Sequence, residues 1–202
     1  MSESKPDKNS RINVIKFALL VSFICSLLIT GAAGGLKKFQ LENIELDKKI
    51  NLLKAANLID QKNKPSKEEI KRLYDTHIQA IIVDSQGKIL EADNQESLHL
   101  YFYKTEDVIQ GYILPISSRG LWGKIHGYLA FENDGQTVSG FSVFSHSETP
   151  GLGGEIESAW FQKNFKGKKI LNSQNKFVSV GIAKGKVANL PEKDRENYVD
   201  GI

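Results

Sequence analysis

The sequence predicts an α+β domain with a mainly antiparallel sheet and flanking helices, preceded by one N-terminal transmembrane helix. An uncharged run near the start of the chain, residues 17–36, predicts the membrane helix. Short β-type runs follow it, and two of them flank the hairpin turn Asn133-Asp134-Gly135. Hairpins of this kind outnumber alternating strand–helix–strand units, which favours an antiparallel sheet over a parallel one.

Composition narrows the class of protein. The chain has 202 residues, 40% of them hydrophobic, and a net charge of +3. This balanced charge gives no support for nucleic-acid binding. Cys25 is the only cysteine and lies in the apolar run, so the chain predicts no internal disulfide, cysteine-based zinc site or iron–sulfur cluster. We expect Cys25 to be an inert packing residue.

The membrane segment is expected to divide the start of the chain into a cytoplasmic tail, residues 1–12, and a transmembrane helix, residues 13–36. About 20 uncharged residues span the ~30 Å of a bilayer core. Lys16 on one side and Lys37 with Lys38 on the other can reach the headgroups. A cleaved signal peptide is the alternative, although its apolar core is normally shorter. The short tail is the natural cytoplasmic side, since large domains translocate whatever their charge.

A helical stalk or linker is predicted over residues 37–76. Residues 38–60 carry apolar side chains near helical spacing, and this stripe either packs on the chain's own domain or binds a partner. After a polar break, Ser66 and Glu69 form a capping box for a second helix, which runs to about Thr76.

The main domain is predicted over residues 77–202. Its expected strands are residues 78–83 with a return through 88–90, then 108–116, 124–131, 137–144 and 177–182. Residues 155–165 predict a helix that ends at Lys166-Gly167-Lys168.

The most informative loop is predicted between the strand at 137–144 and the helix at 155–165. Its sequence is His146-Ser147-Glu148-Thr149-Pro150-Gly151-Leu152-Gly153-Gly154. Proline restricts the backbone, and the glycines leave backbone N–H groups uncovered and can adopt positive φ. A tight loop of this kind would let a flat ligand touch the main chain.

The sequence does not match the motifs of other nucleotide-binding, catalytic or metal sites. Ile156 occupies the place of the third glycine of a dinucleotide fingerprint, and Val187 replaces the Ser or Thr that a phosphate loop needs. The sequence contains no recognisable catalytic set, and His77, His99 and His126 lack metal-ligand spacing. We therefore predict no catalytic residue and no metal site.

His146-x-Glu148-Thr149-Pro150-Gly151-Leu152-Gly153 resembles the signature of the membrane-tethered FMN-binding subunits of two redox pumps. One is the C subunit of the sodium-translocating NADH:quinone reductase, and the other is the G subunit of the Rnf electron-transport complex. Leu121-Trp122-Gly123, Gly127-Tyr128-Leu129-Ala130 and the stretch from Leu46 to Ala56 favour the resemblance to the quinone-reductase protein.

The resemblance implies a flavin-carrying electron-transfer protein in a bacterial inner-membrane complex that oxidises NADH, reduces ubiquinone and exports sodium. Its partners would be the other subunits and membrane lipid, and its main domain would face the periplasm. The implied FMN-binding residues are His146, Glu148, Thr149, Gly151, Leu152, Gly153, Gly154, Leu121, Trp122 and Gly123. Alternatives are the Rnf protein, with ferredoxin and NAD as end carriers, and a cofactor-free anchored scaffold.

Three roles within this set stay open. His146 either tunes the flavin or is a half-buried residue at a strand end. Trp122 either covers the ring or caps the core. Glu148 could pair with Arg119.

In the family, FMN is linked by a phosphoester to the threonine of a Ser-Gly-Ala-Thr motif. Here the lead-in to that motif is Tyr198-Val199-Asp200-Gly201-Ile202, and the acceptor threonine is expected just after Ile202. A tether raises the effective concentration of the ring beside its site, so a shallow loop suffices. We therefore expect residues 1–202 alone to hold free FMN only weakly.

Overall fold

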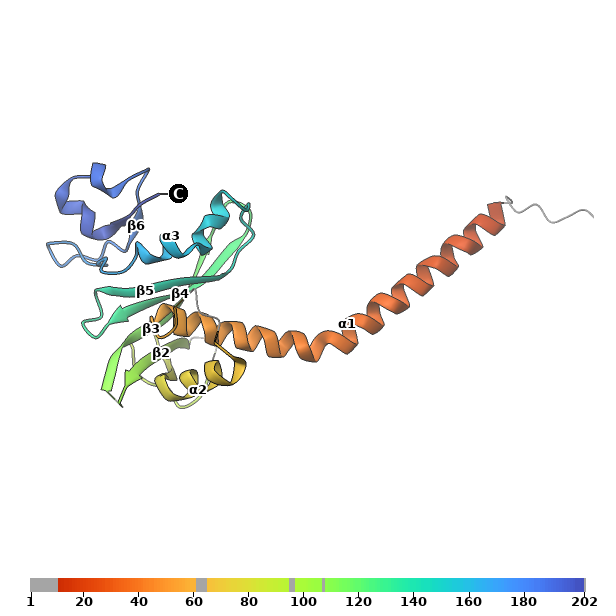
Figure 1. The fold of residues 1–202 in the computed structure, drawn as a ribbon, viewed down its shortest axis with the longest axis horizontal. Helices are drawn as coiled ribbons and strands as arrows, with labels where there is room; N and C mark the ends of the chain where they lie inside the picture. Colours follow the sequence, from red (N-terminus) through yellow and green to blue (C-terminus); the bar gives the residue numbers. More distant parts are fainter. Residues whose placement is uncertain (1–10, 61–64, 95–96, 107, 202) are drawn as a thin grey trace, which may run out of the picture. The chain divides into compact units, whose positions relative to one another are not determined.

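The computed structural model describes residues 11–60, 65–94, 97–106 and 108–201 (Figure 1). The chain divides into two compact units, Met1–Glu45 and Leu46–Ile202. Each unit is described by itself below.

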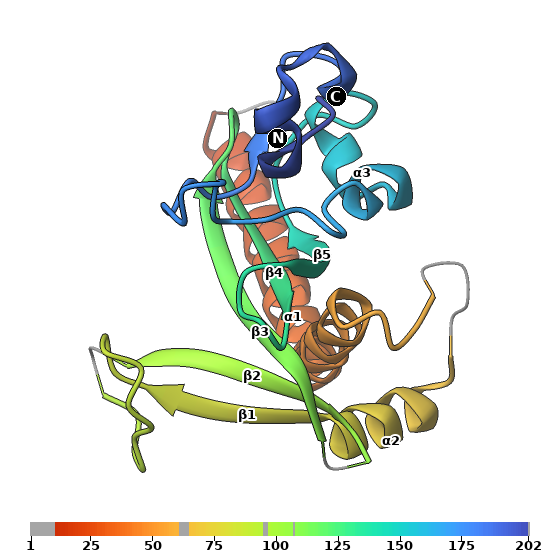
Figure 2. The same ribbon diagram turned by 90° about the vertical axis from the view of Figure 1, so that its left-hand side faces the viewer.

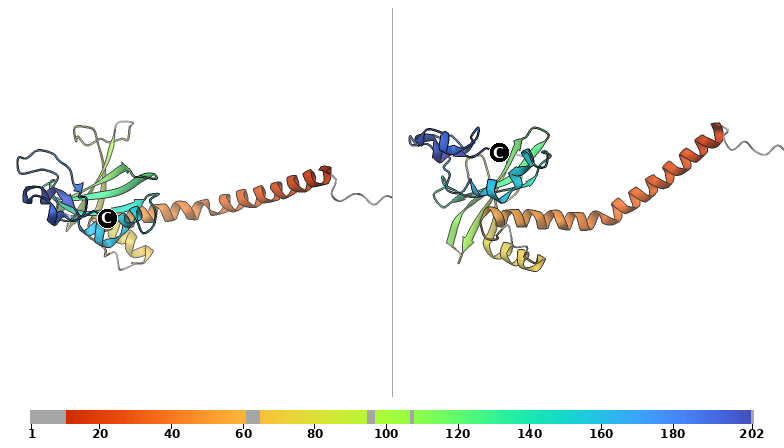
Figure 3. Two further views of the ribbon diagram at one scale, coloured as in Figure 1. Left: turned by 90° about the horizontal axis from the view of Figure 1, so that it is seen from above. Right: turned by 45° about the horizontal axis from the view of Figure 1, so that its top comes forward.

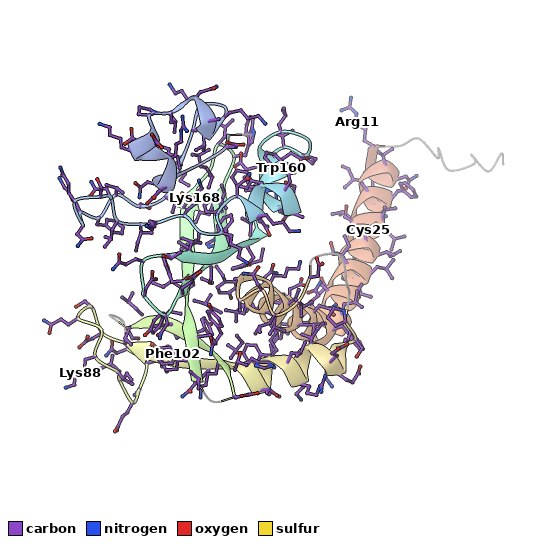
Figure 4. All side chains as sticks on the ribbon, turned by 60° about the vertical axis from the view of Figure 1, so that its left-hand side comes forward. Arg11, Cys25, Lys88, Phe102, Trp160 and Lys168 are labelled. Atoms are coloured by element: carbon purple, nitrogen blue, oxygen red, sulfur yellow. The ribbon has the colours of Figure 1, made fainter. Side chains whose placement is uncertain are left out.

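The first unit is the N-terminal part of a single continuous helix, α1 (Arg11–Ala55). This part contains the predicted span, residues 13–36, and it is long and apolar enough to cross a membrane. Its side chains are exposed, among them Cys25, which Figure 4 labels on the helix. Exposed apolar side chains all around a helix of this length are typical of a membrane anchor. The prediction of one apolar N-terminal helix is confirmed.

The second unit is built on a five-stranded antiparallel sheet in which each strand pairs with the next along the chain. The strands are β1 (Ile78–Val83), β2 (Leu98–Thr105), β3 (Val108–Arg119), β4 (Lys124–Glu132) and β5 (Val138–Ser145). This order confirms the predicted α+β class with an antiparallel sheet.

Strand β2 is absent from the sequence-based prediction. Its apolar and aromatic residues run together from Leu100 to Tyr103, with no alternation of polar and apolar positions. Both of its faces carry apolar contacts: Tyr103 lies in the core, and Phe102 makes an edge contact with Tyr112, with ring centroids 5.4 Å apart. A strand with apolar side chains on both faces lacks the period-2 signal on which the prediction depended.

One face of the sheet is covered by the C-terminal end of α1 and by α2 (Lys67–His77). Ser66 begins α2 as predicted, because its hydroxyl accepts a hydrogen bond from the Glu69 amide at 3.2 Å. The buried residues of this core are Leu52, Leu53, Ala55, Ala56, Ile70, Ile78, Tyr103, Ile113, Tyr128 and Ala130. From Leu46 onward, the apolar stripe of residues 38–60 therefore packs on its own domain.

A second core lies where the C-terminal segment packs on β4 and β5. It consists of Phe131, Val138, Val143, Ile156, Phe161, Phe165 and Val199. The segment contains η1 (Gly153–Glu157), α3 (Ala159–Lys163), β6 (Gly181–Ile182), η2 (Val187–Asn189), η3 (Glu192–Asn197) and β7 (Tyr198–Val199). Figure 2 shows α2 beside β1 and β2, and α3 near β5.

The predicted helix over residues 155–165 is wrong as a single element. Ser158 has extended backbone angles, φ −67° and ψ 144°, which separate η1 from α3. Its hydroxyl donates to the Glu155 carbonyl at 2.6 Å and accepts from the Phe161 amide at 3.4 Å. A serine that caps the next helix thus interrupts an otherwise helical pattern.

Two other strand predictions are also wrong in extent. Of residues 177–182, only Gly181 and Ile182 form a strand, which pairs in parallel with β7. Ser179 has φ 61°, and this left-handed conformation interrupts the extended backbone. Residues 88–90 return from the turn at Gly87 but contribute only an isolated bridge between Val83 and Ile89.

Candidate cofactor-binding loops

Two loops contain all the predicted site residues. The hairpin loop, residues 120–123, joins β3 to β4, and the Gly120 amide closes it by donating to the Gly123 carbonyl at 2.8 Å. The glycine loop, residues 146–154, joins β5 to η1. Within it, the amides of Leu152 and Gly154 donate to the Thr149 carbonyl at 3.1 and 3.0 Å. Both loops are thus tightly folded turns.

Glu148 connects the two loops. Its Oε1 accepts a hydrogen bond from the backbone amide of Trp122 at 3.0 Å. Among the described residues, no ion pair joins Glu148 to Arg119, so that possibility is not realised. The carboxylate satisfies a backbone donor in the opposite loop instead.

Glycines leave space for neighbouring side chains where the loops approach each other. A Cβ at Gly120 would overlap Oε1 of Glu148, and a Cβ at Gly123 would lie 2.8 Å from Oγ of Ser147. A Cβ at Gly153 would lie 3.0 Å from Oε2 of Glu148. Such contacts are closer than a β-carbon normally makes. Gly120 and Gly123 thus leave space for the opposite loop, and Gly153 leaves space for Glu148 within its own loop.

His146 supports the glycine loop from within. Its Nδ1 accepts from the Glu148 amide at 3.0 Å, so this nitrogen carries a lone pair and Nε2 carries the proton. Nε2 lies 3.2 Å from Oε1 of Glu157, to which it donates. The side chain is only 12% exposed. Of the two roles considered for His146, these contacts favour a structural one.

Three large apolar side chains of the loops are exposed. Leu121 is 82% exposed, Trp122 69% and Leu152 66%. Trp122 therefore does not cap the core. We call these three residues the apolar patch. Large exposed apolar side chains on two loops that a hydrogen bond connects are typical of a surface that binds a ligand.

The backbone at the tip of the glycine loop is open. Gly151 has φ 73°, and a Cβ there would meet nothing within 4 Å. Thr149 and Pro150 beside it are exposed. A flat, largely apolar ring fits these features, because it could lie against the bare main chain at Gly151 and against the apolar patch.

The structure thus brings the ten predicted residues together and divides their roles. Leu121, Trp122, Thr149, Gly151 and Leu152 face outward. The other five form the contacts within and between the loops: Gly123, His146, Glu148, Gly153 and Gly154.

Sequence reasoning missed three residues that support the loops: Gly120, Ser147 and Glu157. The Gly120-x-x-Gly123 spacing signals a tight hairpin, whereas the other two contacts depend on tertiary structure. The remaining histidines lie outside these loops. His77 Nδ1 is 2.8 Å from the Lys104 carbonyl, His99 pairs with Asp93, and His126 stacks on Phe144.

The end of the described chain is also held in place. Val199 is fully buried, Asp200 Oδ1 accepts from the Val187 amide at 2.7 Å, and the Gly201 amide donates to the Gly185 carbonyl at 2.8 Å. Figures 1 and 2 place this end beside the segment that follows β5, and the views in Figure 3 agree.

Comparisons with known proteins agree with these features. A family model described as an FMN-binding domain matches residues 120–202, which include both loops. The chain is 31% identical to the C subunit of Na(+)-translocating NADH-quinone reductase from Pasteurella multocida, over 97% of this chain and 84% of that protein. It is also 31% identical to the corresponding C subunit from Yersinia pestis, over 100% of this chain and 86% of that protein.

Solved structures of this kind share the fold. The crystal structure of the C subunit from Parabacteroides distasonis matches with a TM-score of 0.70 and 29% identity, over 83% of this chain and 84% of that one. The crystal structure of NqrC from Shewanella oneidensis matches with a TM-score of 0.62 and 18% identity, over 79% of this chain and 84% of that one. At 18% identity, the second match supports the fold alone.

Proposed function

Because this chain belongs to the family formed by the C subunits of Na(+)-translocating NADH-quinone reductases, we propose that it works as one redox centre of a membrane complex that oxidises NADH, reduces ubiquinone and exports sodium. FMN is its cofactor, in line with the FMN-binding domain match. The observation that carries the proposal is the apolar patch on two connected loops inside that matched region.

The chain's own residues bind and orient the ring under this proposal. Bound FMN supplies one- and two-electron transfer, which needs no catalytic side chain from the protein. Leu121, Trp122 and Leu152 exclude water from the ring, and Gly151 allows the main chain to approach it. Excluding water lowers the local dielectric, so nearby charges and dipoles act more strongly on the ring's potential.

Residues 46–202 lie on the periplasmic side of the bacterial inner membrane in this proposal, and α1 is the single anchor. The length and apolar composition of the span support the anchor. Protease treatment of intact spheroplasts tests this orientation. Digestion of the main domain is expected, whereas protection until the membrane is opened would contradict it.

The presence of the cofactor is tested on the complete gene product, made in its own host. We expect a yellow protein with bound flavin. A covalent link, as the resemblance implies, would leave a fluorescent band after denaturing electrophoresis. A product that contains no flavin at all would contradict the proposal and favour a cofactor-free scaffold.

The location of the ring is tested by paired glycine substitutions. Gly151 and Gly135 both have positive φ, 73° and 66°, and both would place a Cβ in open space. Gly151→Val and Gly135→Val should therefore impose similar backbone strain. Only Gly151→Val should shift the flavin absorption spectrum and midpoint potential, since Gly135 lies in the β4–β5 turn. An unchanged flavin in folded Gly151→Val protein would contradict the proposed site.

A further inference from the structure

Glu148 stands out because its side chain leaves its own loop to bind the backbone of another. The residue is half-buried, and its Oε1 lies 3.0 Å from the amide nitrogen of Trp122. Trp122 itself is 69% exposed, so packing does little to fix it. A carboxylate that accepts from a backbone N–H makes a charge-assisted hydrogen bond, which is stronger than a neutral one.

The space around this carboxylate is kept free by two glycines. A Cβ at Gly120 would overlap Oε1, and a Cβ at Gly153 would approach Oε2 to 3.0 Å. Neither glycine has a positive φ, so the backbone conformation alone does not require glycine there. The Glu148 side chain is the nearest group at both positions, and Cδ1 of Ile125 also lies 2.9 Å from the Cβ position at Gly120.

The backbone of Glu148 is fixed as well. Its amide donates to Nδ1 of His146 at 3.0 Å, and Nε2 of the same ring lies 3.2 Å from Oε1 of Glu157. The glycine loop is therefore tied to η1 on one side and, through the Glu148 carboxylate, to the hairpin loop on the other. Hydrogen bonds at both ends leave the side chain a narrow range of positions.

We infer that Glu148 is a positioning residue for the flavin. Its carboxylate holds Leu121 and Trp122 at a set distance from Leu152, so that the apolar patch is formed before FMN arrives. This role rests on the proposed function, but the hydrogen bond that underlies it can be tested without flavin. A preformed surface loses less freedom on binding and holds the ring in one environment.

Amide hydrogen exchange in the flavin-free protein tests the bond. The Trp122 amide should exchange at least about tenfold faster in Glu148→Ala than in wild type, because its acceptor is gone. Glu148→Gln should restore most of the protection, since its amide oxygen can still accept. Glu192→Ala removes an exposed carboxylate outside both loops and should leave exchange unchanged.

Gly120→Ala should also break the hydrogen bond between the Glu148 carboxylate and the Trp122 amide. The added methyl group should displace the carboxylate and reproduce the faster Trp122 exchange. In a Glu148→Ala background, where the carboxylate is absent, Gly120→Ala should add little. Additive effects of the two substitutions would contradict the steric relation between Gly120 and Glu148.

The flavin-loaded complete gene product tests the positioning role. Flavin fluorescence and midpoint potential should change in Glu148→Ala and return toward wild type in Glu148→Gln, while the melting temperature changes little. Unchanged Trp122 exchange in Glu148→Ala would overturn the inference. So would faster exchange with an unchanged flavin, although that result would leave the proposed function intact. A wild-type product without flavin would overturn both proposals.

Discussion

The sheet core and the pair of loops use large apolar residues in opposite ways. In the core, Ile113 and Val138 are fully buried and surrounded by side chains. In the loops, Leu121 and Trp122 are mostly exposed, and hydrogen bonds and glycines hold the backbone beneath them. Burial stabilises the first region, whereas the second presents its apolar surface for binding. Stability and cofactor binding therefore depend on different residues in this domain.

The largest expected effect lies in the core. Ile113 is 0% exposed and packs between β2, β4 and the covering helices. Ile113→Ala should lower the free energy of unfolding by about 2–5 kcal/mol, because it removes buried methyl groups and leaves a cavity. Urea unfolding followed by circular dichroism measures this loss. A loss below about 1 kcal/mol would break the comparison, since the core would then tolerate truncation as the loops do.

A smaller loss of stability is expected when a glycine in the core, Gly140, is replaced by alanine. A Cβ at Gly140 would overlap the backbone carbonyl oxygen of Ala55, which cannot rotate away. Gly140→Ala should therefore cost about 1–3 kcal/mol through overpacking. Gly135→Ala, with open space around its Cβ, is the control for alanine itself and should cost about 1 kcal/mol of backbone strain. Equal losses would show that α1 does not press on β5 at this point.

Much of the fold follows from the sequence, because its signals are local. The turn at Asn133-Asp134-Gly135, the Ser66 cap and the apolar run at residues 17–36 each depend on neighbouring residues, and all three are confirmed. Strand β2 was missed because apolar side chains on both of its faces remove the alternating pattern. The division at Ser158 was missed because a side-chain cap interrupts a pattern that is otherwise helical.

The location of the site could be predicted from the sequence, but the role of each residue within it could not. The glycines and Pro150 identify the glycine loop, and Leu121-Trp122-Gly123 identifies the hairpin loop, even though the loops are far apart in the sequence. That Glu148 reaches the amide of Trp122, and that His146 reaches Glu157, depends on how the strands align. Sequence spacing contains no such information.

Within the glycine loop, replacing His146 should lower the stability of the protein by a moderate amount. His146→Ala removes the acceptor of the Glu148 amide and the contact to Glu157, and should cost about 1 kcal/mol. His146→Asn should recover part of this loss, because its side-chain oxygen can take the place of Nδ1. Thermal unfolding of the two variants measures the difference. If asparagine recovers nothing, the Nδ1 hydrogen bond does not support the loop.

The smallest expected effect is a pH dependence of stability that arises in the β4–β5 turn, outside both the core and the two loops. The Thr137 hydroxyl, which donates to Asp134 at 2.6 Å, and the amides of Thr137 and Gln136 lower the pKa of Asp134 below its usual 3.8. A lowered folded pKa adds stability above the unfolded pKa, and this is lost as pH falls through the folded value. Solvent screening keeps the effect under about 1 kcal/mol.

Asp134→Asn isolates the charge in that turn. Wild type should be slightly more stable than the variant at about pH 7, and the gap should close as the pH falls below the usual aspartate pKa of 3.8 and through the lowered folded pKa. Urea midpoints across this range measure the gap. A gap that widens toward low pH would contradict the sign.

Fluorescence of the flavin in the complete gene product measures whether the flavin ring lies against the two loops. The described chain has two tryptophans: Trp122 on the hairpin loop, and Trp160 on α3, which is 49% exposed and labelled in Figure 4. An indole in contact with a flavin quenches its emission. Trp122→Ala should therefore brighten the flavin and lengthen its lifetime, whereas Trp160→Ala should not. Equal emission in wild type and Trp122→Ala would contradict the account.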